Sequence, residues 1–168
     1  ARAAPHPEHP APTGVRMNII EALAWLDARL DHETSSAGIA AGRIDGLSLD
    51  GMRDLMALQG DPQDAVPVIH ITGTNGKGTV AAMITSLLMA HGLSVGTYTS
   101  PHLERLNERI ARDGEPIGDE DLAEVLSGIA AVEPLLEVQP SWFEVLTAAA
   151  FRWFAEAPAD VAAVAVGL

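Results

Sequence analysis

Cysteine is absent from this sequence, and positive charge is scarce. The absence of cysteine excludes a disulfide framework and a thiolate-bound metal, and it fits a reducing compartment, so we expect a cytoplasmic protein. Ten Lys and Arg residues oppose 23 Asp and Glu residues, which gives a formal net charge of −13. A duplex-binding domain needs a basic face that displaces counterions from phosphates, so this balance argues against nucleic acid, and against an anionic membrane surface, as a partner.

Long hydrophobic runs are also missing, since no apolar stretch reaches the roughly 18 to 20 residues of a transmembrane helix. The start of the chain is rich in Ala, Pro and His and lacks the apolar core of a signal peptide. We interpret residues 1–17 as a disordered leader. The composition, 48% hydrophobic and 20% charged, is typical of a globular domain, which we place at 18–168.

Apolar spacing after the leader predicts helices and strands in alternation. Helices are expected over 18–31, 48–59, 79–91, 119 to about 129, and 142–156, and strands over 66–72, 94–99 and 160–166. Ser48 and Asp119 are candidate helix caps, the segment 34–46 is a predicted loop, and Asp113-Gly114 indicates a tight turn. Strands that alternate with helices indicate an α/β fold, a parallel sheet with helices on both faces.

The sequence stops at Gly167-Leu168, at the carboxyl end of the third expected strand. In open α/β sheets that edge is where ligands bind. Three strands with two open edges are few for a stable sheet. We therefore interpret the chain as a domain truncated after its third strand, and we expect this piece to aggregate or to be poorly stable by itself.

A glycine loop follows the first expected strand: Gly73-Thr74-Asn75-Gly76-Lys77-Gly78-Thr79. A strand, a glycine turn and a helix bind phosphate because backbone N–H groups converge on it and the helix N-terminus adds partial positive charge. Lys77, the one lysine of the chain, supplies a charge for the outer phosphates, and Thr79 offers a hydroxyl to a phosphate-bound Mg²⁺. We therefore expect ATP and Mg²⁺ as ligands.

This loop departs from the strict G-x-x-x-x-G-K-[ST] pattern. Ile71 stands six residues before Lys77, and Gly78 follows it. The alternative interpretation is a glycine-rich connection that needs no ligand. Three glycines and a lysine within six positions, directly after an apolar strand, favour nucleotide binding.

Three motifs in order carry a family resemblance. Val68-Ile69-His70-Ile71-Thr72 and the glycine loop look like the phosphate loop of the Mur ligase superfamily. The other two motifs are Tyr98-Thr99-Ser100-Pro101-His102-Leu103 with Asn107-Glu108-Arg109-Ile110, and Ser141-Trp142-Phe143-Glu144-Val145-Leu146-Thr147. Together they resemble the bifunctional folylpolyglutamate synthase/dihydrofolate synthase family over 18–168, which implies the P-loop sheet of a Mur ligase central domain.

The resemblance implies an ATP-dependent ligase with dihydropteroate or a reduced folate, L-glutamate and ATP as substrates. ATP phosphorylates a carboxylate, and the amino group of glutamate then displaces phosphate from the acyl phosphate. It further implies that Gly73 to Thr79 hold the phosphates, with Lys77 as the catalytic residue. Ser100 joins Thr79 at the Mg²⁺, and Ser141, Phe143 and Glu144 lie near the pterin pocket.

Each of these residues also has a purely structural interpretation. Ser100 before a proline is an ordinary end of a strand. Phe143 shares a helical face with apolar neighbours and so suits core packing, and Glu144 suits a solvated helix surface. His70 and His102 could suggest metal ligands, but a histidine satisfied within a strand is the simpler interpretation of His70, and His102 has no role that we can derive.

Two differences set this chain apart from the family pattern. The family ends the third strand with a Mg²⁺-binding glutamate, where this chain has Ala165. A methyl group cannot bind a metal, so Mg²⁺ binding should be weakened. Gly51 stands where the family has an arginine. The C-terminal glutamate-binding domain of the family would lie past Leu168. Because that part is missing and Ala165 replaces the Mg²⁺-binding glutamate, the isolated chain is expected to be inactive. We expect the full-length protein to be a monomer.

Two alternatives remain open at this point. The chain could be a non-catalytic module that binds nucleotide without turnover, and Ala165 is the main support for this. It could also be another Mur-type ligase that builds cell-wall peptides. The Thr99-Ser100-Pro101-His102 segment argues against the second.

Overall fold

The computed structural model describes residues 16–29 and 49–166. Most of the predicted leader, the predicted loop 34–46, the candidate cap Ser48 and the residues after 166 lie outside these ranges. Met17, the last residue of the predicted leader, is buried, and its backbone N–H donates to Ser127 Oγ at 2.9 Å.

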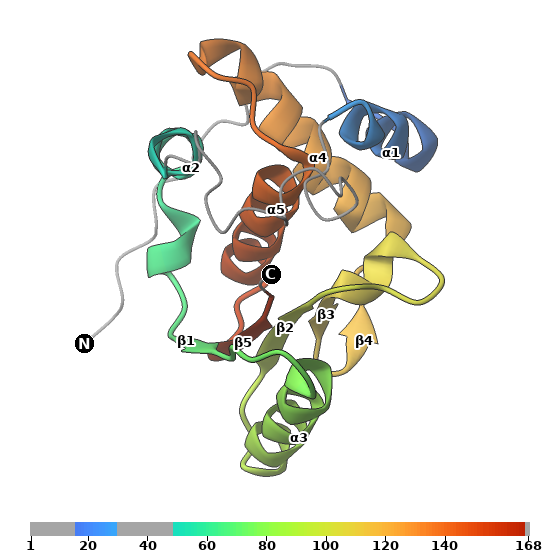
Figure 1. The fold of residues 1–168 in the computed structure, drawn as a ribbon, viewed down its shortest axis with the longest axis vertical. Helices are drawn as coiled ribbons and strands as arrows, with labels where there is room; N and C mark the ends of the chain where they lie inside the picture. Colours follow the sequence, from blue (N-terminus) through green and yellow to red (C-terminus); the bar gives the residue numbers. More distant parts are fainter. Residues whose placement is uncertain (1–15, 30–48, 167–168) are drawn as a thin grey trace, which may run out of the picture.

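The described residues form a sheet of five strands in the order β1-β5-β2-β3-β4 (Figure 1). The strands are β1 (Val68–His70), β2 (Val95–Thr99), β3 (Ile110–Arg112), β4 (Glu115–Pro116) and β5 (Val161–Ala165). The strands β1, β5 and β2 pair in parallel, with β5 in the middle, and β3 and β4 continue the sheet antiparallel. The last of the three predicted strands therefore lies between the first two.

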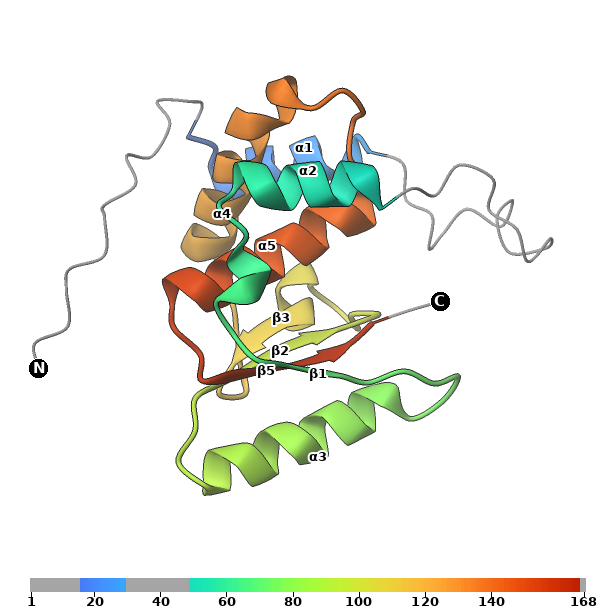
Figure 2. The same cartoon turned by 90° about the vertical axis from the view of Figure 1, so that its left-hand side faces the viewer.

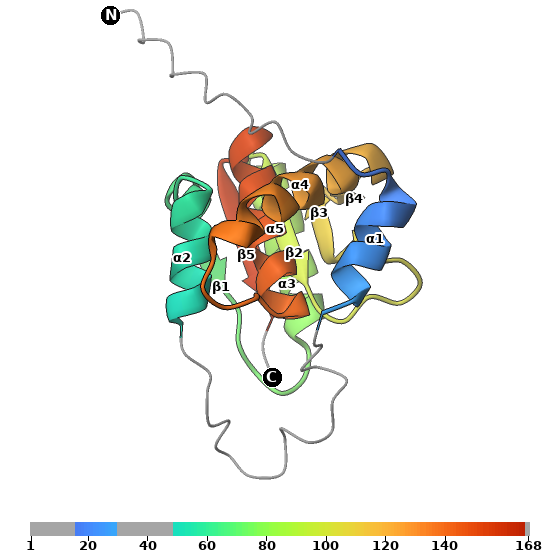
Figure 3. The ribbon, with the colours of Figure 1, turned by 90° about the horizontal axis from the view of Figure 1, so that it is seen from above.

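The helices lie on both faces of this sheet, as predicted. They are α1 (Ile19–Asp27), α2 (Asp50–Leu58), α3 (Lys77–Ala90), α4 (Asp119–Val132) and α5 (Trp142–Glu156), with short 3-10 turns η1 (Pro62–Asp64), η2 (Leu106–Arg109) and η3 (Glu133–Leu135). Figure 2 shows α3 alone on one face and the other four helices on the opposite face. Seen from above, α4 and α5 lie between α1 and α2 (Figure 3).

The antiparallel strands β3 and β4 correct the prediction of a three-stranded parallel sheet. The turn between them is the predicted tight turn at Asp113-Gly114, where both residues have positive φ, 53° and 83°. Two such residues form the turn that matches the twist of a hairpin. Strands of three and two residues are too short for an alternating pattern, so the sequence showed the turn without its strands.

Local signals set the helix starts. Asn18 caps α1, and its side chain and that of Glu21 bond reciprocally to backbone N–H groups. The predicted cap Asp119 is wrong by one residue, because Gly118 occupies the cap position and Asp119 begins α4. The residue in the cap position of α2 is Leu49.

The core lies between the sheet and the layer of α4 and α5. The rings of Tyr98 on β2 and Phe154 on α5 are fully buried there. A Cβ added at Gly96 would come within 2.7 Å of the Phe154 ring, so glycine lets α5 approach β2 closely. On the other face, Thr85 of α3 and Thr97 of β2 share a hydrogen bond of 2.9 Å.

Candidate functional site

Three segments leave the sheet at one edge, because β1, β5 and β2 are parallel neighbours (Figure 2). The glycine loop follows β1, Ser100 follows β2, and Ala165 is the last residue of β5. The carboxyl edge of a parallel sheet is the usual place for a ligand. The fold thus brings together the predicted phosphate loop and the predicted metal-binding serine.

Backbone conformation explains two glycines of the loop. Gly73 has φ 149° and Gly76 has φ 79°, values that residues with a Cβ rarely adopt. Gly76 is the residue before α3, which begins at Lys77, two residues earlier than predicted. The first backbone N–H groups of a helix have no partner within the helix, so this start can bind an anion.

The Lys77 side chain folds back across the loop. Its Nζ donates to the carbonyl oxygen of Gly73 at 2.6 Å, although the contact is exposed to solvent. The ammonium group is therefore held beside the loop backbone and the start of α3. A positive charge there can neutralise the outer phosphates of a nucleotide.

Ala165 lies between the glycine loop and Ser100, on the face of the sheet that carries α3. It is in register with Thr99, and Thr97 on the same side of β2 contacts Thr85 of α3. Ala165 is fully buried. Ala165 therefore lies at the candidate site. Where the family resemblance predicts a carboxylate, this chain has a methyl group.

The described residues of this site could hold Mg²⁺ only together with the phosphates of a bound nucleotide. Thr79, in the first turn of α3, and Ser100, after β2, offer hydroxyl oxygens, which suit this hard cation. Within 16–29 and 49–166, no group of three acidic or histidine side chains could hold a metal ion. His70 lies in β1 and is exposed.

The start of α5 holds the three residues expected near a pterin pocket. Ser141 caps the helix, and Glu144 Oε2 accepts from Ser141 N–H at 2.8 Å and from Ser141 Oγ at 2.7 Å. The ring of Phe143 is partly buried and lies 6.5 Å from the ring of Tyr98. Ser141 and Glu144 thus form a capping box. A serine followed three residues later by a glutamate predicts such a box, and our sequence analysis did not identify it.

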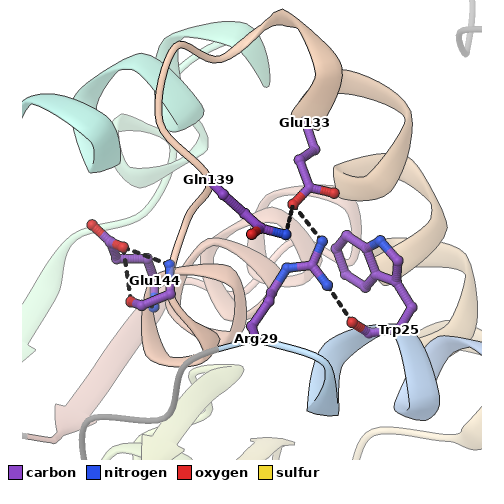
Figure 4. A network of polar contacts seen from close by, with 6 residues as sticks. Trp25, Arg29, Glu133, Gln139 and Glu144 are labelled. Carbon is purple, nitrogen blue, oxygen red and sulfur yellow. Dashed lines mark hydrogen bonds and ion pairs between the residues drawn. The ribbon is translucent and has the colours of Figure 1, made fainter.

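A polar network joins α1 to η3 in the same region (Figure 4). The Arg29 guanidinium lies 3.4 Å from the centroid of the Trp25 ring and pairs with Glu133. Gln139 donates to the same Glu133 carboxylate at 3.3 Å. Sequence reasoning did not find this network, because its members are about a hundred positions apart.

His102 has a partner that the sequence did not indicate. The Nε–H of Arg109 donates to His102 Nδ1 at 2.9 Å, and the Arg109 guanidinium lies 4.8 Å from the centroid of the Trp142 ring. The next residue back, Glu108, accepts backbone hydrogen bonds from the same loop. The Asn107-Glu108-Arg109-Ile110 motif was the only available signal.

A hollow of about 720 Å³ lies elsewhere, between η2, β4 and the start of α4. Its lining includes Asp119, whose Oδ1 accepts hydrogen bonds from Arg105 at 2.7 Å and from Asn107 at 3.0 Å. No helix in the described part of the chain is long and apolar enough to cross a membrane.

Known proteins with similar sequences and folds are folate ligases. No family model matches the chain. It is 37% identical to the dihydrofolate synthase/folylpolyglutamate synthase of Bacillus subtilis over 140 residues, 81% of this chain and 30% of that protein. It is 44% identical to the protein of that name from Mycobacterium tuberculosis over 137 residues, 75% of this chain and 28% of that protein.

A folylpolyglutamate synthase solved in complex with AMPPCP and folate has a similar fold. The TM-score is 0.76 and the sequence identity 35%, over 90% of this chain and 35% of that one. The chain thus spans about a third of the length of the proteins that it matches. By its three motifs, its sequence identity and its fold, the chain belongs to the folylpolyglutamate synthase/dihydrofolate synthase family over that third.

Proposed function

We propose that the protein to which this chain belongs is an ATP-dependent ligase of folate metabolism. It joins L-glutamate to dihydropteroate or to the γ-carboxylate of a folate. The observation that carries this proposal is the glycine loop at the carboxyl edge of three parallel strands, with Lys77 held across it. The folate and AMPPCP of the similar solved structure support the two substrate classes.

The reaction has two balanced steps. The substrate carboxylate oxygen attacks the γ-phosphorus of ATP, and the bond between that phosphorus and the β,γ-bridging oxygen breaks. The products of this step are an acyl phosphate and ADP. The amino nitrogen of glutamate then attacks the acyl carbon, loses a proton and expels inorganic phosphate as the amide forms. In such transfers the protein contributes mainly position and electrostatic stabilisation.

Residues of this chain have distinct proposed roles in those steps. The glycine loop and the start of α3 hold the phosphates, and the Lys77 ammonium stabilises the charge on the transferred γ-phosphoryl group. Thr79 and Ser100 are the proposed ligands of a Mg²⁺ that neutralises phosphate charge. We expect the reaction in the cytoplasm and a monomeric full-length protein.

The start of α5 is the proposed boundary of the pterin site. Phe143 is only partly buried and so has surface to offer a flat ring. Ser141 and Glu144 hold each other in the capping box, and we propose that they shape this wall rather than react. The Glu144 carboxylate keeps a second oxygen for a substrate N–H donor.

Nucleotide binding is tested on the chain itself by thermal melting with MgATP. A ligand that binds only the folded state stabilises it by about 2.7 kcal/mol at a hundred times its Kd. We expect MgATP to raise the Tm of the chain and to have no effect on the Lys77→Ala variant. Arg53→Ala, a change at an exposed arginine, is the control and should keep the full MgATP shift. An equal shift in the Lys77→Ala variant would refute the proposed phosphate site.

Ala165 favours a second candidate, a module that binds nucleotide without turnover. The two candidates differ in phosphate release when dihydropteroate and glutamate are supplied together. Glutamate-dependent phosphate release by the chain, or by a longer protein that contains it, supports the ligase. MgATP binding without any release from that longer protein supports the binding module.

A further inference from the structure

The connection that leads into α5 has no regular secondary structure of its own. Residues 136–141 lie between η3, which ends at Leu135, and α5, which begins at Trp142, and they form neither helix nor strand. Connections of this kind are more mobile than the elements that they join. The position of Ser141, the last residue of the connection, therefore depends on contacts with other parts of the molecule.

Gln139 makes one of these contacts. Its Nε2 donates at 3.3 Å to Oε1 of Glu133, the first residue of η3. The same oxygen accepts from the Arg29 guanidinium, so the Glu133 carboxylate lies between Arg29 and the connection (Figure 4). Gln139 stands two residues before Ser141. Arg29 therefore acts on the approach to α5 through Glu133.

Arg29 itself is held firmly at the end of α1. Its side chain is 2% exposed, its guanidinium lies 3.4 Å from the centroid of the Trp25 ring, and it donates to the Trp25 carbonyl oxygen. A stacked guanidinium is planar and has fixed donor directions, which leaves it little freedom. A buried guanidinium also requires its counter-charge, because an unpaired buried charge is strongly destabilising. Arg29 consequently fixes where the Glu133 carboxylate lies.

Asp27, the last residue of α1, contacts the same region at a second point. Its Oδ1 accepts from the indole Nε1–H of Trp142 at 3.4 Å. Trp142 directly follows Ser141 and is only 7% exposed. The end of α1 thus holds the chain on both sides of Ser141, at Trp142 directly and at Gln139 through Glu133.

We propose that Arg29 and Asp27 are positioning residues for the acid substrate, because from the end of α1 they set the place of Ser141 and of the capping box that Ser141 forms with Glu144. This inference rests on the proposed function for the identity of the substrate. Neither residue has to touch the ligand. A displacement of about 1 Å away from the chemistry can cost on the order of a hundredfold, so a shifted wall would hold a pterin poorly.

The glycine loop should not respond to these contacts. Lys77 donates to Gly73 within the loop itself, and α3 lies on the face of the sheet opposite to α1 and α5 (Figure 2). Loss of the α1 contacts should therefore weaken the binding of dihydropteroate and leave the binding of MgATP unchanged. A merely structural role would weaken both, because a partly unfolded chain loses both sites.

The role of Arg29 is tested with a double variant, Arg29→Met with Glu133→Leu. Replacing both members of a largely buried ion pair by apolar side chains leaves no unpaired charge, so the chain should still melt cooperatively. Gln139 then has no carboxylate to donate to. We expect dihydropteroate affinity in calorimetric titration to fall about tenfold or more, with MgATP affinity unchanged. Wild-type dihydropteroate affinity in a folded double variant would overturn the role of Arg29.

Gln139 allows a test that leaves the ion pair in place. Gln139→Glu is nearly isosteric and puts a second carboxylate beside Glu133, so the contact becomes repulsive and dihydropteroate affinity should fall. Gln139→Lys keeps a donor for Glu133 and should bind nearly as well as the wild type. Val138→Glu is the matched control, because it adds the same charge at a neighbouring side chain that is 70% exposed. Equal losses in Gln139→Glu and Val138→Glu would show that charge, not the contact, causes the effect.

The contact of Asp27 is tested by the NMR signal of the Trp142 indole N–H, one of three such groups in the chain. Asp27→Asn keeps an oxygen acceptor, so the signal and the dihydropteroate affinity should stay close to those of the wild type. Asp27→Ala removes the acceptor and should move the signal upfield and weaken dihydropteroate binding. An unmoved signal in Asp27→Ala would overturn the contact, and a moved signal with unchanged affinity would overturn its positioning role.

The outcomes separate this inference from the proposed function. If the wild-type chain binds dihydropteroate and no variant weakens that binding, the inference fails and the proposed function stands. If the wild-type chain binds MgATP but no dihydropteroate, the proposed substrate fails and the inference fails with it. If the Arg29 double variant does not fold, Gln139→Glu and Asp27→Ala decide the question, since both positions are exposed.

Discussion

Glu108 is the residue whose protonation should affect stability most visibly. Backbone hydrogen bonds, first from Leu103 and then from Arg105, hold the pKa of its carboxyl below the ordinary 4.5. Burial acts in the opposite direction and raises this pKa. The Glu104 N–H and the charge of His102 lower it further. A carboxylate with a depressed folded pKa stabilises the fold above its unfolded pKa, and the stabilisation is lost as pH falls through the folded pKa. We expect Glu108→Gln to melt below the wild type at pH 7.

The gap in Tm between wild type and Glu108→Gln should narrow below about pH 4.5 and close once the pH is under the folded pKa. Melting curves recorded between pH 7 and pH 3 measure it. Glu104→Gln, which removes an exposed carboxylate from the same loop, should show a much smaller pH-dependent gap. A Glu108→Gln gap that stays constant with pH would show that the carboxylate does not fasten the loop.

Single residues were predictable from sequence where their conformation is local. Gly73 and Gly76 belong to the expected glycine turn, and both have positive φ. The phosphate-binding role of this turn and of Lys77 stays a prediction. The partner of His102 was not predictable in this way. Arg109 contacts it only because η2 turns back on the loop, so spacing alone left His102 without a role.

At the scale of an element, the start of α3 depends on one backbone angle. Gly76 has φ 79°, and a side chain in this left-handed region costs roughly 1–2 kcal/mol. We expect Gly76→Ala to lower the Tm of the chain and to reduce its stabilisation by MgATP, because the first N–H groups of α3 would be displaced. Thermal melting with and without MgATP measures both effects.

Gly78 provides the matched control for that substitution. It lies in the first turn of α3 with ordinary φ, and an added Cβ would meet nothing within 4 Å. Alanine is favoured over glycine in a helix by about 1 kcal/mol, so Gly78→Ala should melt at or above the wild type. If both variants melt alike, the left-handed angle at Gly76 is not what shapes the loop.

Elements were predictable in proportion to their length and periodicity. The predicted helix 142–156 coincides with α5, because fifteen residues carry several turns of an apolar stripe. The strands β3 and β4 were missed, since two or three residues show no period, and the pairing of β3 with β2 and of β4 with β3 is a contact in space. The position of β5 between β1 and β2 likewise follows from packing rather than from order along the chain.

At the scale of the whole molecule, α3 leaves a large apolar surface in solvent. Met83 is 61% and Leu87 65% exposed, with Val80 on the same face of the helix. A helix that is apolar on its outer face as well as on the side that packs against the sheet is typical of one covered in a larger protein. Exposed apolar patches of this kind promote association. We therefore expect the isolated 168-residue chain to associate as its concentration rises.

Two pairs of substitutions on α3 test the source of that association by sedimentation. Met83→Glu with Leu87→Glu should give a monomer of 17.6 kDa at every concentration, with a Tm close to that of the wild type, since both positions are exposed. Ala82→Glu with Ser86→Glu adds the same two charges at the same spacing and removes no large apolar side chain, so it should still associate. If both pairs abolish association, added charge explains the result, and the apolar face of α3 is not the contact. If neither does, the open edge of β1 becomes the surface to test, because an unpaired edge strand can also join two copies.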